Sequence, residues 1–475
     1  MKLNVSPPCA RTHAYAFSSP DSITTSFPAS QLLINPLLEV GEMKIEVKKW
    51  SMVCPAKHTP KHTLWMSNLD SVVPRIHVPT VYLYKPNAFC SNFFDASRLK
   101  EALSNALVQF YPVAGRLGLD ANGRIQINCN GEGVLFQEAE ADAIIDDLGD
   151  FTPSHRLRHL IPVVDHSAHI SSYPLLLLQV TYFKCGGVCL GVAIHHMVAD
   201  GSGCIHFINS WSDITRGIPI AISPFFDRTI LRARDPPAPR FSHVEYLPPP
   251  PLHGPSTLKP TSTLILHLTP EHLNALKAKS VRHGSPSPSS VKYSTYETLA
   301  AHLWRCICKA RGLSHDQPTK LYIPTDGRLR LRPTLPPGYF GNALFTSTLT
   351  ANSGDLQSEA FSDTVQRIRN AIAGMEDEYL RSAVDYLEMQ PNLTALVRGA
   401  HTFRSPNLVV GSWTRLPIHD ANFGWGRPMH MGLGSGVFEG NACIQRSPTK
   451  DNHLSVVICL EAQPMQLFKD LLYDI

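Results

Sequence analysis

The sequence predicts a mixed α/β protein of two domains joined by a proline-rich crossover. Its 475 residues are 43% hydrophobic and 17% charged, which suits two folded cores and excludes a charge-rich disordered chain. Helical stripes of apolar residues alternate with short apolar strands over most of the length. Between about residues 216 and 260, closely spaced prolines exclude helix interiors and central strands.

Composition divides the chain into four ranges. Residues 1–42 are rich in Ser, Thr and Pro, so we expect a disordered extension or a start codon placed too early, with a weak organelle transit peptide as the alternative. Residues 43–215 are expected to form an N-terminal α/β domain that opens with a strand at Met43. Residues 216–260 are expected to form a stiff crossover, and residues 261–475 a C-terminal α/β domain.

Several elements of the first half are predicted from local patterns. Residues 96–110 carry apolar side chains at i, i+3 and i+4 spacing after a candidate N-cap, Asp95, and predict a helix. Asn-Gly pairs flank residues 124–129, which predicts a strand between tight turns. Residues 175–194 contain a Gly-Gly turn between two apolar runs and predict a buried hairpin, and residues 204–213 predict a helix.

The second half is predicted in the same way. Ser294 and Glu297 form a capping box that opens a helix, and a long helical stretch has a break near Pro391. The last 70 residues combine short strands with many glycines. The patterns predict a strand over 261–268 and helices over 270–283, 294–311, 362–398 and 463–472.

Charge and motifs exclude several classes of protein. A net charge of +4 from 43 basic and 39 acidic residues gives no basic footprint for nucleic acid, and no apolar run reaches the 18 residues of a membrane span. The eleven cysteines are scattered and odd in number, so we expect reduced, mostly buried thiols and a cytoplasmic location. There is no G-x-S-x-G elbow, phosphate loop or H-E-x-x-H, and we expect no metal site.

One histidine stands in a context that favours catalysis. His196 and Asp200 form H-x-x-x-D on a glycine-terminated loop directly after the predicted strand over 188–194. The spacing alone is weak, because 22 histidines give about one such match by chance. A neutral imidazole at a strand end suits general-base work on a hydroxyl or amine, and a structural histidine is the alternative.

A second signal lies near the C-terminus. In Asn422-Phe-Gly424-Trp-Gly426, two glycines flank a tryptophan, which indicates a rigid turn with an aromatic wedge and a structural role. Upstream, Trp413 follows Gly411-Ser412 and offers an indole N–H, which is a donor only. The indole could simply pack in a core, or it could point at a developing oxyanion.

The H-x-x-x-D at mid-chain and the N-F-G-W-G near the end together resemble the plant BAHD acyltransferases, whose signatures are H-x-x-x-D and D-F-G-W-G. The resemblance runs from Met43 to Ile475 and is strongest for the hydroxycinnamoyl-CoA:shikimate/quinate hydroxycinnamoyltransferases. Segments that carry it are residues 91–95, 110–117, 128–134, 335–342 and 412–420.

The resemblance implies two similar-sized, chloramphenicol-acetyltransferase-like domains with a solvent channel between them. It implies a monomer that binds no cofactor and takes a hydroxycinnamoyl-CoA thioester and a small hydroxy-acid acceptor as substrates. His196 would be the general base in a ternary complex without an acyl-enzyme, and Trp413 would donate to the oxyanion. Asp200 would turn away from the reacting centre and pair with Arg328 or Arg330.

The resemblance also assigns an acceptor pocket. Arg398 matches the arginine that holds the acceptor carboxylate in this subgroup, as a planar guanidinium can. Val78 and Gly411 replace usual threonines, which should weaken polyol recognition by about 0.5–1.5 kcal/mol for each lost hydrogen bond. Five residues match pocket positions: His77, Val78, Thr80, Tyr82 and Gly411.

Some departures keep other functions open. Asn422 replaces an aspartate and keeps its shape without its charge. The expected function is transfer of a p-coumaroyl or caffeoyl group to shikimate, quinate or a similar acid. The alternatives are transfer to another hydroxy acid, as in rosmarinate synthase, N-acylation of an amine, or a non-catalytic paralogue.

Overall fold

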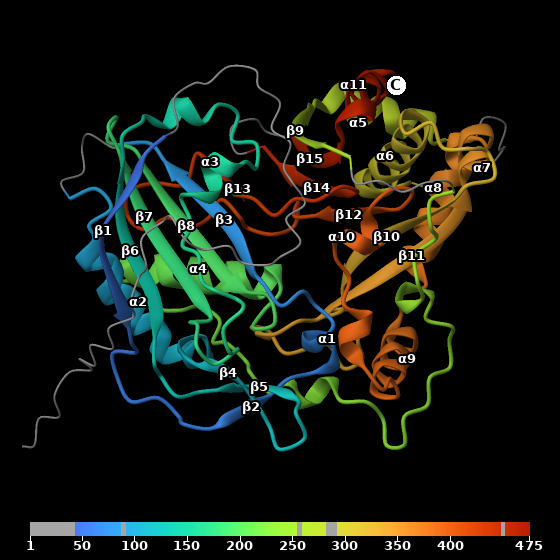
Figure 1. The fold of residues 1–475 in the computed structure, drawn as a ribbon. Coiled ribbons are helices and arrows are strands. Elements are labelled where there is room, and N and C mark those ends of the chain that lie inside the picture. The colour runs from blue at the N-terminus through green and yellow to red at the C-terminus, as the bar shows by residue number, and fades with distance from the viewer. Residues whose placement is uncertain (1–42, 87–91, 254–258, 282–291, 448–451) are drawn as a thin grey trace, which may run out of the picture.

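The computed structural model describes residues 43–86, 92–253, 259–281, 292–447 and 452–475. These residues form two six-stranded mixed sheets, each flanked by helices, and one small three-stranded sheet (Figure 1). The mixed α/β architecture of two sheet-rich halves is therefore confirmed. The predicted extension, residues 1–42, lies outside the described residues.

The first large sheet holds the strand that leads to His196. The helices α2 (Ala96–Gln109) and α4 (Gly201–Thr215) pack on one face, where Trp211 Nε1 donates to Leu99 O at 3.0 Å. In spatial order its strands are β1 (Ile45–Val53), β6 (Val134–Ala141), β7 (Leu176–Phe183), β8 (Val188–His195), β3 (His77–Tyr84) and β13 (His430–Leu433). The small sheet consists of β2 (Thr63–Trp65), β5 (Ile125–Asn128) and β4 (Arg116–Leu119).

The second large sheet is built from the C-terminal half. Its spatial order is β11 (Leu344–Asn352), β10 (Pro318–Asp326), β12 (Leu408–Ser412), β14 (Asn441–Arg446), β15 (Leu454–Glu461) and β9 (Thr261–Leu268). Its apolar core is shared with α5 (Pro270–Lys279), α6 (Thr295–Ala310), α8 (Phe361–Ala373) and α11 (Ala462–Tyr473).

Shorter elements lie at the ends and between the sheets. The helices are α1 (Asn68–Ser71), α3 (His155–Arg158), α7 (Ser353–Ser358), α9 (Asp377–Glu388) and α10 (Ala400–Phe403). The 3-10 turns are η1 (Tyr111–Ala114), η2 (Ile145–Leu148), η3 (Arg228–Leu231), η4 (Val244–Tyr246) and η5 (Leu393–Leu396).

Most predicted elements are confirmed where local signals were complete. Asp95 caps α2 by accepting from Arg98 N at 2.7 Å, and Ser294 and Glu297 form the predicted capping box of α6. The helix predicted over 204–213 was too short, because Asp200 caps it and it begins at Gly201. The helix predicted over 362–398 was wrong in its continuity, because residues 374–376 separate α8 from α9.

The predicted domain boundary is crossed by one strand. β13 lies within the range predicted as the C-terminal domain, yet it pairs with β3 in the first sheet (Figure 1). The crossover is attached to the second half: Arg234 Nε donates to Asp385 Oδ2 on α9 at 2.6 Å. Among the described residues of the crossover, η3 and η4 are the regular elements.

The described residues bear on two expectations from composition. Six of the nine described cysteines are buried, as expected. In the same ranges, every helix is too short or too polar to cross a bilayer.

Candidate active site

His196 lies on the loop that joins β8 to α4. Figure 1 shows both of these elements. β8 is buried along its whole length and α4 begins at Gly201, so the loop is short and anchored at both ends. The His196 N–H donates to Ile76 O at 2.9 Å, and its carbonyl accepts from Asn342 Nδ2 at 2.9 Å. One segment from each half of the chain therefore holds the His196 backbone.

The His196 side chain is half-buried and favours its neutral form. Burial lowers the pKa of His196 from its ordinary value of 6.5, against weaker opposing effects from its own carbonyl, Asp200, Asn342 and Asp70. Nδ1 is buried and makes no hydrogen bond of normal geometry with the described residues. The ring is therefore neutral near pH 7 and can accept a proton.

Asp200 is fully engaged with groups other than His196. It caps α4 by accepting from Gly203 N at 3.1 Å, and Ala343 N donates to it at 3.0 Å. Its two oxygens face Arg328, with Oδ2–Nη1 at 2.8 Å and Oδ1–Nη2 at 2.9 Å. Burial opposes ionisation of Asp200, but Arg328 outweighs it, so the pKa of Asp200 is lowered.

Of the two arginines predicted as partners of Asp200, Arg328 is confirmed in this contact. Burial works against the charge of Arg328, but Asp200 outweighs it and raises the pKa of Arg328. Arg330 was the wrong alternative, because its Nη1 donates to the carbonyls of Ile372 and Met375 at 2.9 and 3.0 Å. The Asp200–Arg328 pair therefore ties the start of α4 to the second half of the chain.

Trp413 follows β12 and is carried toward α4. The backbone N–H of Trp413 donates to Ile444 O on β14 at 2.8 Å. Its half-buried side chain packs against the apolar core of the first half of the chain. Further along, Pro417 O accepts from Asn209 Nδ2 on α4 at 3.1 Å. That its indole N–H faces a reacting oxygen stays a prediction.

The glycine motif lies at the other end of α4. Asn422 Oδ1 accepts from Gly424 N at 2.9 Å and from Gly426 N at 3.1 Å, and both glycines have left-handed φ angles of 102° and 114°. Gly424 lies against Arg98, which donates to the carbonyl of Thr215, the last residue of α4. α4 has 15 residues and is therefore about 20 Å long, so the motif and the His196 loop lie at opposite ends of that length. The motif is structural, and an amide oxygen serves both hydrogen bonds without a charge.

β3 places the predicted acceptor residues on two faces. Successive strand side chains alternate, so Val78, Thr80 and Tyr82 share one face and His77 lies on the other. Tyr82 is fully buried. His77 Nε2 hydrogen-bonds to Pro174 O at 2.8 Å, and burial lowers the pKa of His77 to about 4. The structure therefore does not bring His77 together with the other three.

Arg398 and Gly411 lie in the second half. The Arg398 guanidinium stands over the Tyr246 ring at 5.2 Å, and its Nη1 is buried without a hydrogen-bond partner among the described residues. Gly411 is half-buried in β12 and pairs with Cys443. The contact that holds Arg398 is thus with the crossover, and within the described ranges no hydrogen bond joins it to the His196 loop.

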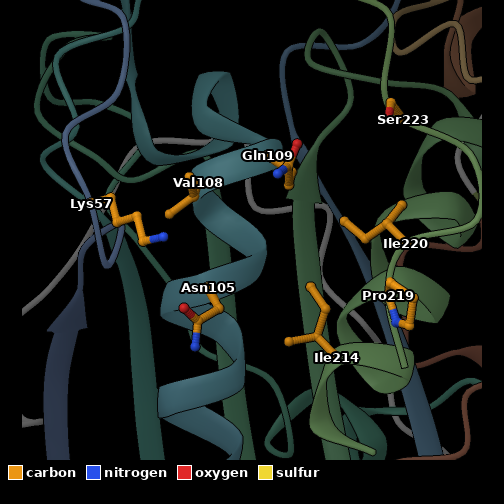
Figure 2. A pocket seen from close by; sticks show the side chains of 8 residues that line it. All are labelled: Lys57, Asn105, Val108, Gln109, Ile214, Pro219, Ile220 and Ser223. Carbon is orange, nitrogen blue, oxygen red and sulfur yellow. The ribbon is translucent and has the colours of Figure 1, made fainter. Parts of the chain in front are cut away.

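Two surface hollows, of about 390 and 380 Å³, lie away from His196. Figure 2 shows the first, where Asn105, Val108 and Gln109 on α2 face Ile214, Pro219 and Ile220. The predicted channel between the two halves therefore stays a prediction. Among the described residues, no group of three or more His, Cys, Asp or Glu side chains is placed to hold a metal ion.

Three residues next to the His196 loop were missed from the sequence: Asp70, Arg228 and Asn342. Asn342 belongs to a segment that carried the resemblance, but it had no role there. Asp70 had a local signal, the capping box with Ser67, which marks a helix start. That signal could not reveal its hydrogen bond to Asn342, 272 residues away.

Comparison with known proteins identifies the family of the chain. The model of the Transferase family matches residues 43–475. A shikimate O-hydroxycinnamoyltransferase of Nicotiana tabacum is 57% identical over 91% of this chain and 100% of its own length. Over the same shares, a hydroxycinnamoyl-CoA:5-hydroxyanthranilate N-hydroxycinnamoyltransferase of Avena sativa is 54% identical, and rosmarinate synthase of Plectranthus scutellarioides is 47% identical.

A solved structure supports the fold independently. Vinorine synthase matches with a TM-score of 0.68 over 89% of this chain and 96% of that chain, at 21% sequence identity. Identity this low shows the fold alone. Together with the family match over residues 43–475, it shows that the chain belongs to the Transferase family of BAHD enzymes and is an acyltransferase that takes an acyl-CoA as co-substrate.

Proposed function

We propose that the protein transfers a hydroxycinnamoyl group from coenzyme A to the hydroxyl of a carboxylate-bearing acceptor such as shikimate or quinate. The observation that carries the proposal is that Asp200 and His196, which lie on one loop, make different contacts. Arg328 engages Asp200 completely, which leaves the neutral imidazole of His196 as the base of that loop. The names of relatives 57% and 54% identical both include hydroxycinnamoyl transfer.

The proposed reaction proceeds in a ternary complex. His196 accepts the acceptor's hydroxyl proton while that oxygen attacks the thioester carbonyl, and the indole N–H of Trp413 donates to the tetrahedral oxyanion. The C–S bond then breaks, and His196 returns the proton to the departing CoA sulfur. A positioned base is worth about 10²–10⁴-fold, and an oxyanion donor about 3–4 kcal/mol.

Arg398 is the proposed contact of the acceptor carboxylate. Its buried Nη1 lacks a partner among the described residues, and a guanidinium can bind a carboxylate at two points. A bound acid would satisfy this donor. The Tyr246 ring under the guanidinium would keep the side chain oriented.

A second candidate is N-acylation of a carboxylate-bearing aromatic amine. Val78 and Gly411 offer no side-chain hydroxyl for a polyol, and the Avena sativa relative is named for 5-hydroxyanthranilate. Such an amine is neutral near pH 7, so Arg398 would bind its carboxylate and would not repel the nucleophile. A cationic polyamine would be repelled.

Separate assays with p-coumaroyl-CoA test these candidates. The acceptors are shikimate, quinate, hydroxyphenyllactate, 5-hydroxyanthranilate and spermidine, and products are identified by mass. The highest kcat/KM is expected for shikimate or quinate. A higher kcat/KM for amide formation with 5-hydroxyanthranilate than for ester formation with shikimate or quinate would favour the second candidate. Product with spermidine alone would contradict both candidates.

Two variants test the proposed roles within the same assay. His196→Ala should lower kcat by at least about 10²-fold with unchanged thioester binding, whereas His206→Ala, on α4, is the matched control. Arg398→Ala should raise the KM for acidic acceptors alone, with Arg330→Ala as control because Arg330 binds helix carbonyls. Turnover retained by His196→Ala would contradict the base.

A further inference from the structure

A fully buried ion pair lies against the loop that carries His196. Asp70 on α1 and Arg228 on η3 are 0% exposed at their side chains, with Oδ2 and Nη1 3.1 Å apart. Oδ2 of Asp70 also accepts from the N–H and the hydroxyl of Ser67 at 2.8 and 2.7 Å. Oδ1 accepts from the backbone and side-chain nitrogens of Asn342 at 2.8 and 2.9 Å.

The two partners of Asp70 donate to three successive carbonyls of the loop. Asn342 Nδ2 donates to His196 O at 2.9 Å. Arg228 donates to Met197 O from Nη1 at 3.4 Å and to Val198 O from Nη2 at 2.7 Å. One carboxylate thus orients both donors, although α1, η3 and residue 342 are far apart in the sequence.

Stability alone is a weak reason for this arrangement. A buried ion pair commonly contributes no more to stability than apolar residues of the same volume. Here Arg228 and Asn342 donate to the backbone carbonyls of residues 196–198, next to the imidazole of His196. Gly341 leaves room for Arg228, since a Cβ at residue 341 would lie 3.1 Å from its Nε and 3.0 Å from Tyr339 OH.

We propose that Asp70 and Arg228 are positioning residues for His196: together they hold the backbone of residues 196–198 so that the imidazole meets the acceptor in one orientation. The inference rests on the proposed base role of His196. The negative charge of Asp70 is also among the influences that raise the pKa of His196 against the effect of burial. Loss of this pair should therefore affect turnover and its pH dependence more than substrate binding.

The test measures kcat, KM and the pH profile of kcat/KM for Asp70→Asn, Arg228→Gln and the double variant. All rates are divided by the amount of folded protein, which is determined by circular dichroism. We expect kcat to fall about 10²-fold, as misplaced catalytic groups do, while both KM values stay within about three-fold. The acid limb of Asp70→Asn should move to lower pH. The double variant should lose little more than either single variant, because the pair acts as a unit.

Asp385→Asn is the matched control, because it makes the same change in a buried carboxylate that binds Arg234 instead of the loop. It should lower the melting temperature and leave kcat and the acid limb unchanged. A wild-type kcat and acid limb in folded Asp70→Asn would overturn the inference, and so would an equal loss in Asp385→Asn.

A separate variant covers failure of Asp70→Asn to fold. Gly341→Ala keeps both charges and places a methyl group 3.1 Å from Arg228 Nε, which must move the guanidinium by a few tenths of an ångström. A fall in kcat smaller than that of Asp70→Asn is therefore expected at constant KM, and unchanged kinetics would overturn the inference. His196→Ala in the same series separates the two ideas. Turnover retained there contradicts the base role, whereas an inactive His196→Ala beside a normal Asp70→Asn contradicts the positioning role alone.

Discussion

Replacement of Arg328 by methionine tests the link between the His196 loop and the second half of the chain. The Asp200 side chain is 3% exposed and that of Arg328 15%. In Arg328→Met, a buried carboxylate keeps only the N–H groups of Gly203 and Ala343. Removal of one partner of a buried ion pair costs about 3–5 kcal/mol of unfolding free energy, and this range is expected here.

The opposite truncation should cost less. In Asp200→Ala, Arg328 keeps Asp326 Oδ1 at 3.2 Å and the carbonyls of Tyr339 and Gly341 at 3.3 and 3.1 Å. The main loss is then the cap of α4, about 1 kcal/mol, with part of the ion-pair energy. The double variant buries no unpaired carboxylate, so it should be more stable than Arg328→Met alone.

Thermal unfolding followed by circular dichroism measures these differences. For roughly 430 residues the unfolding entropy corresponds to about 1 °C per kcal/mol, so Arg328→Met should lower the melting temperature by about 3–5 °C. Arg427→Met is the control, since Arg427 and Asp420 form a pair that is 70% and 48% exposed and worth about 1 kcal/mol or less.

The pH dependence sharpens this prediction. In the wild type the pKa of Asp200 is lowered from 3.8, so its stabilisation is complete above that pH and lost only as pH falls through the folded-state pKa. In Arg328→Met burial acts without the cation and raises the pKa of Asp200, so the loss of unfolding free energy relative to the wild type should shrink as pH falls toward 3.8. The reasoning would be refuted if Arg328→Met lowered the melting temperature no more than Arg427→Met does. It would also be refuted if the Asp200→Ala/Arg328→Met double variant were no more stable than Arg328→Met.

Other perturbations have equally definite outcomes. Burial lowers the pKa of His77 to about 4, so its stabilisation is complete above pH 6.5 and lost as pH falls toward 4. Denaturant titrations should show that His77 makes the unfolding free energy roughly 3 kcal/mol lower at pH 4 than at pH 7. His77→Gln should remove this part of the pH dependence. Asn422→Asp should leave kcat within two-fold, because the same oxygen serves the turn; a ten-fold change in rate would contradict this. Gly191→Ala would place a methyl group on β8 in collision with Leu160 O, so little folded protein is expected; an unchanged melting temperature would disprove this.

The sequence predicted best where the determining contacts are local. Asp95 before α2 and Ser294 with Glu297 before α6 act within one helical turn, and both caps are confirmed. The hairpin over 175–194 was equally clear, because an apolar run, a Gly-Gly turn and a second run are contiguous. The break between α8 and α9 was missed, because Gly374 in an otherwise helical stretch is a weaker signal than a proline.

The candidate site was predicted in part. His196, and Arg328 as one of two candidate partners of Asp200, came from motif and resemblance, and the structure adds their contacts. His77 was grouped with acceptor residues from its sequence position, but strand alternation directs it to the other face. The tertiary contact of Arg398 with Tyr246 was beyond any local pattern.

The sequence by itself determined the elements, the turn chemistry and the family, because helix and strand periods, caps and signature motifs are written in neighbouring residues. Only the tertiary structure decided which partners meet across long separations. The pairing of Asp70 with Asn342 spans 272 residues, that of Asp200 with Arg328 spans 128, and β13 joins a sheet built from the other half. Such contacts depend on how complete sheets pack against one another, a property of the folded chain that no short stretch of it contains.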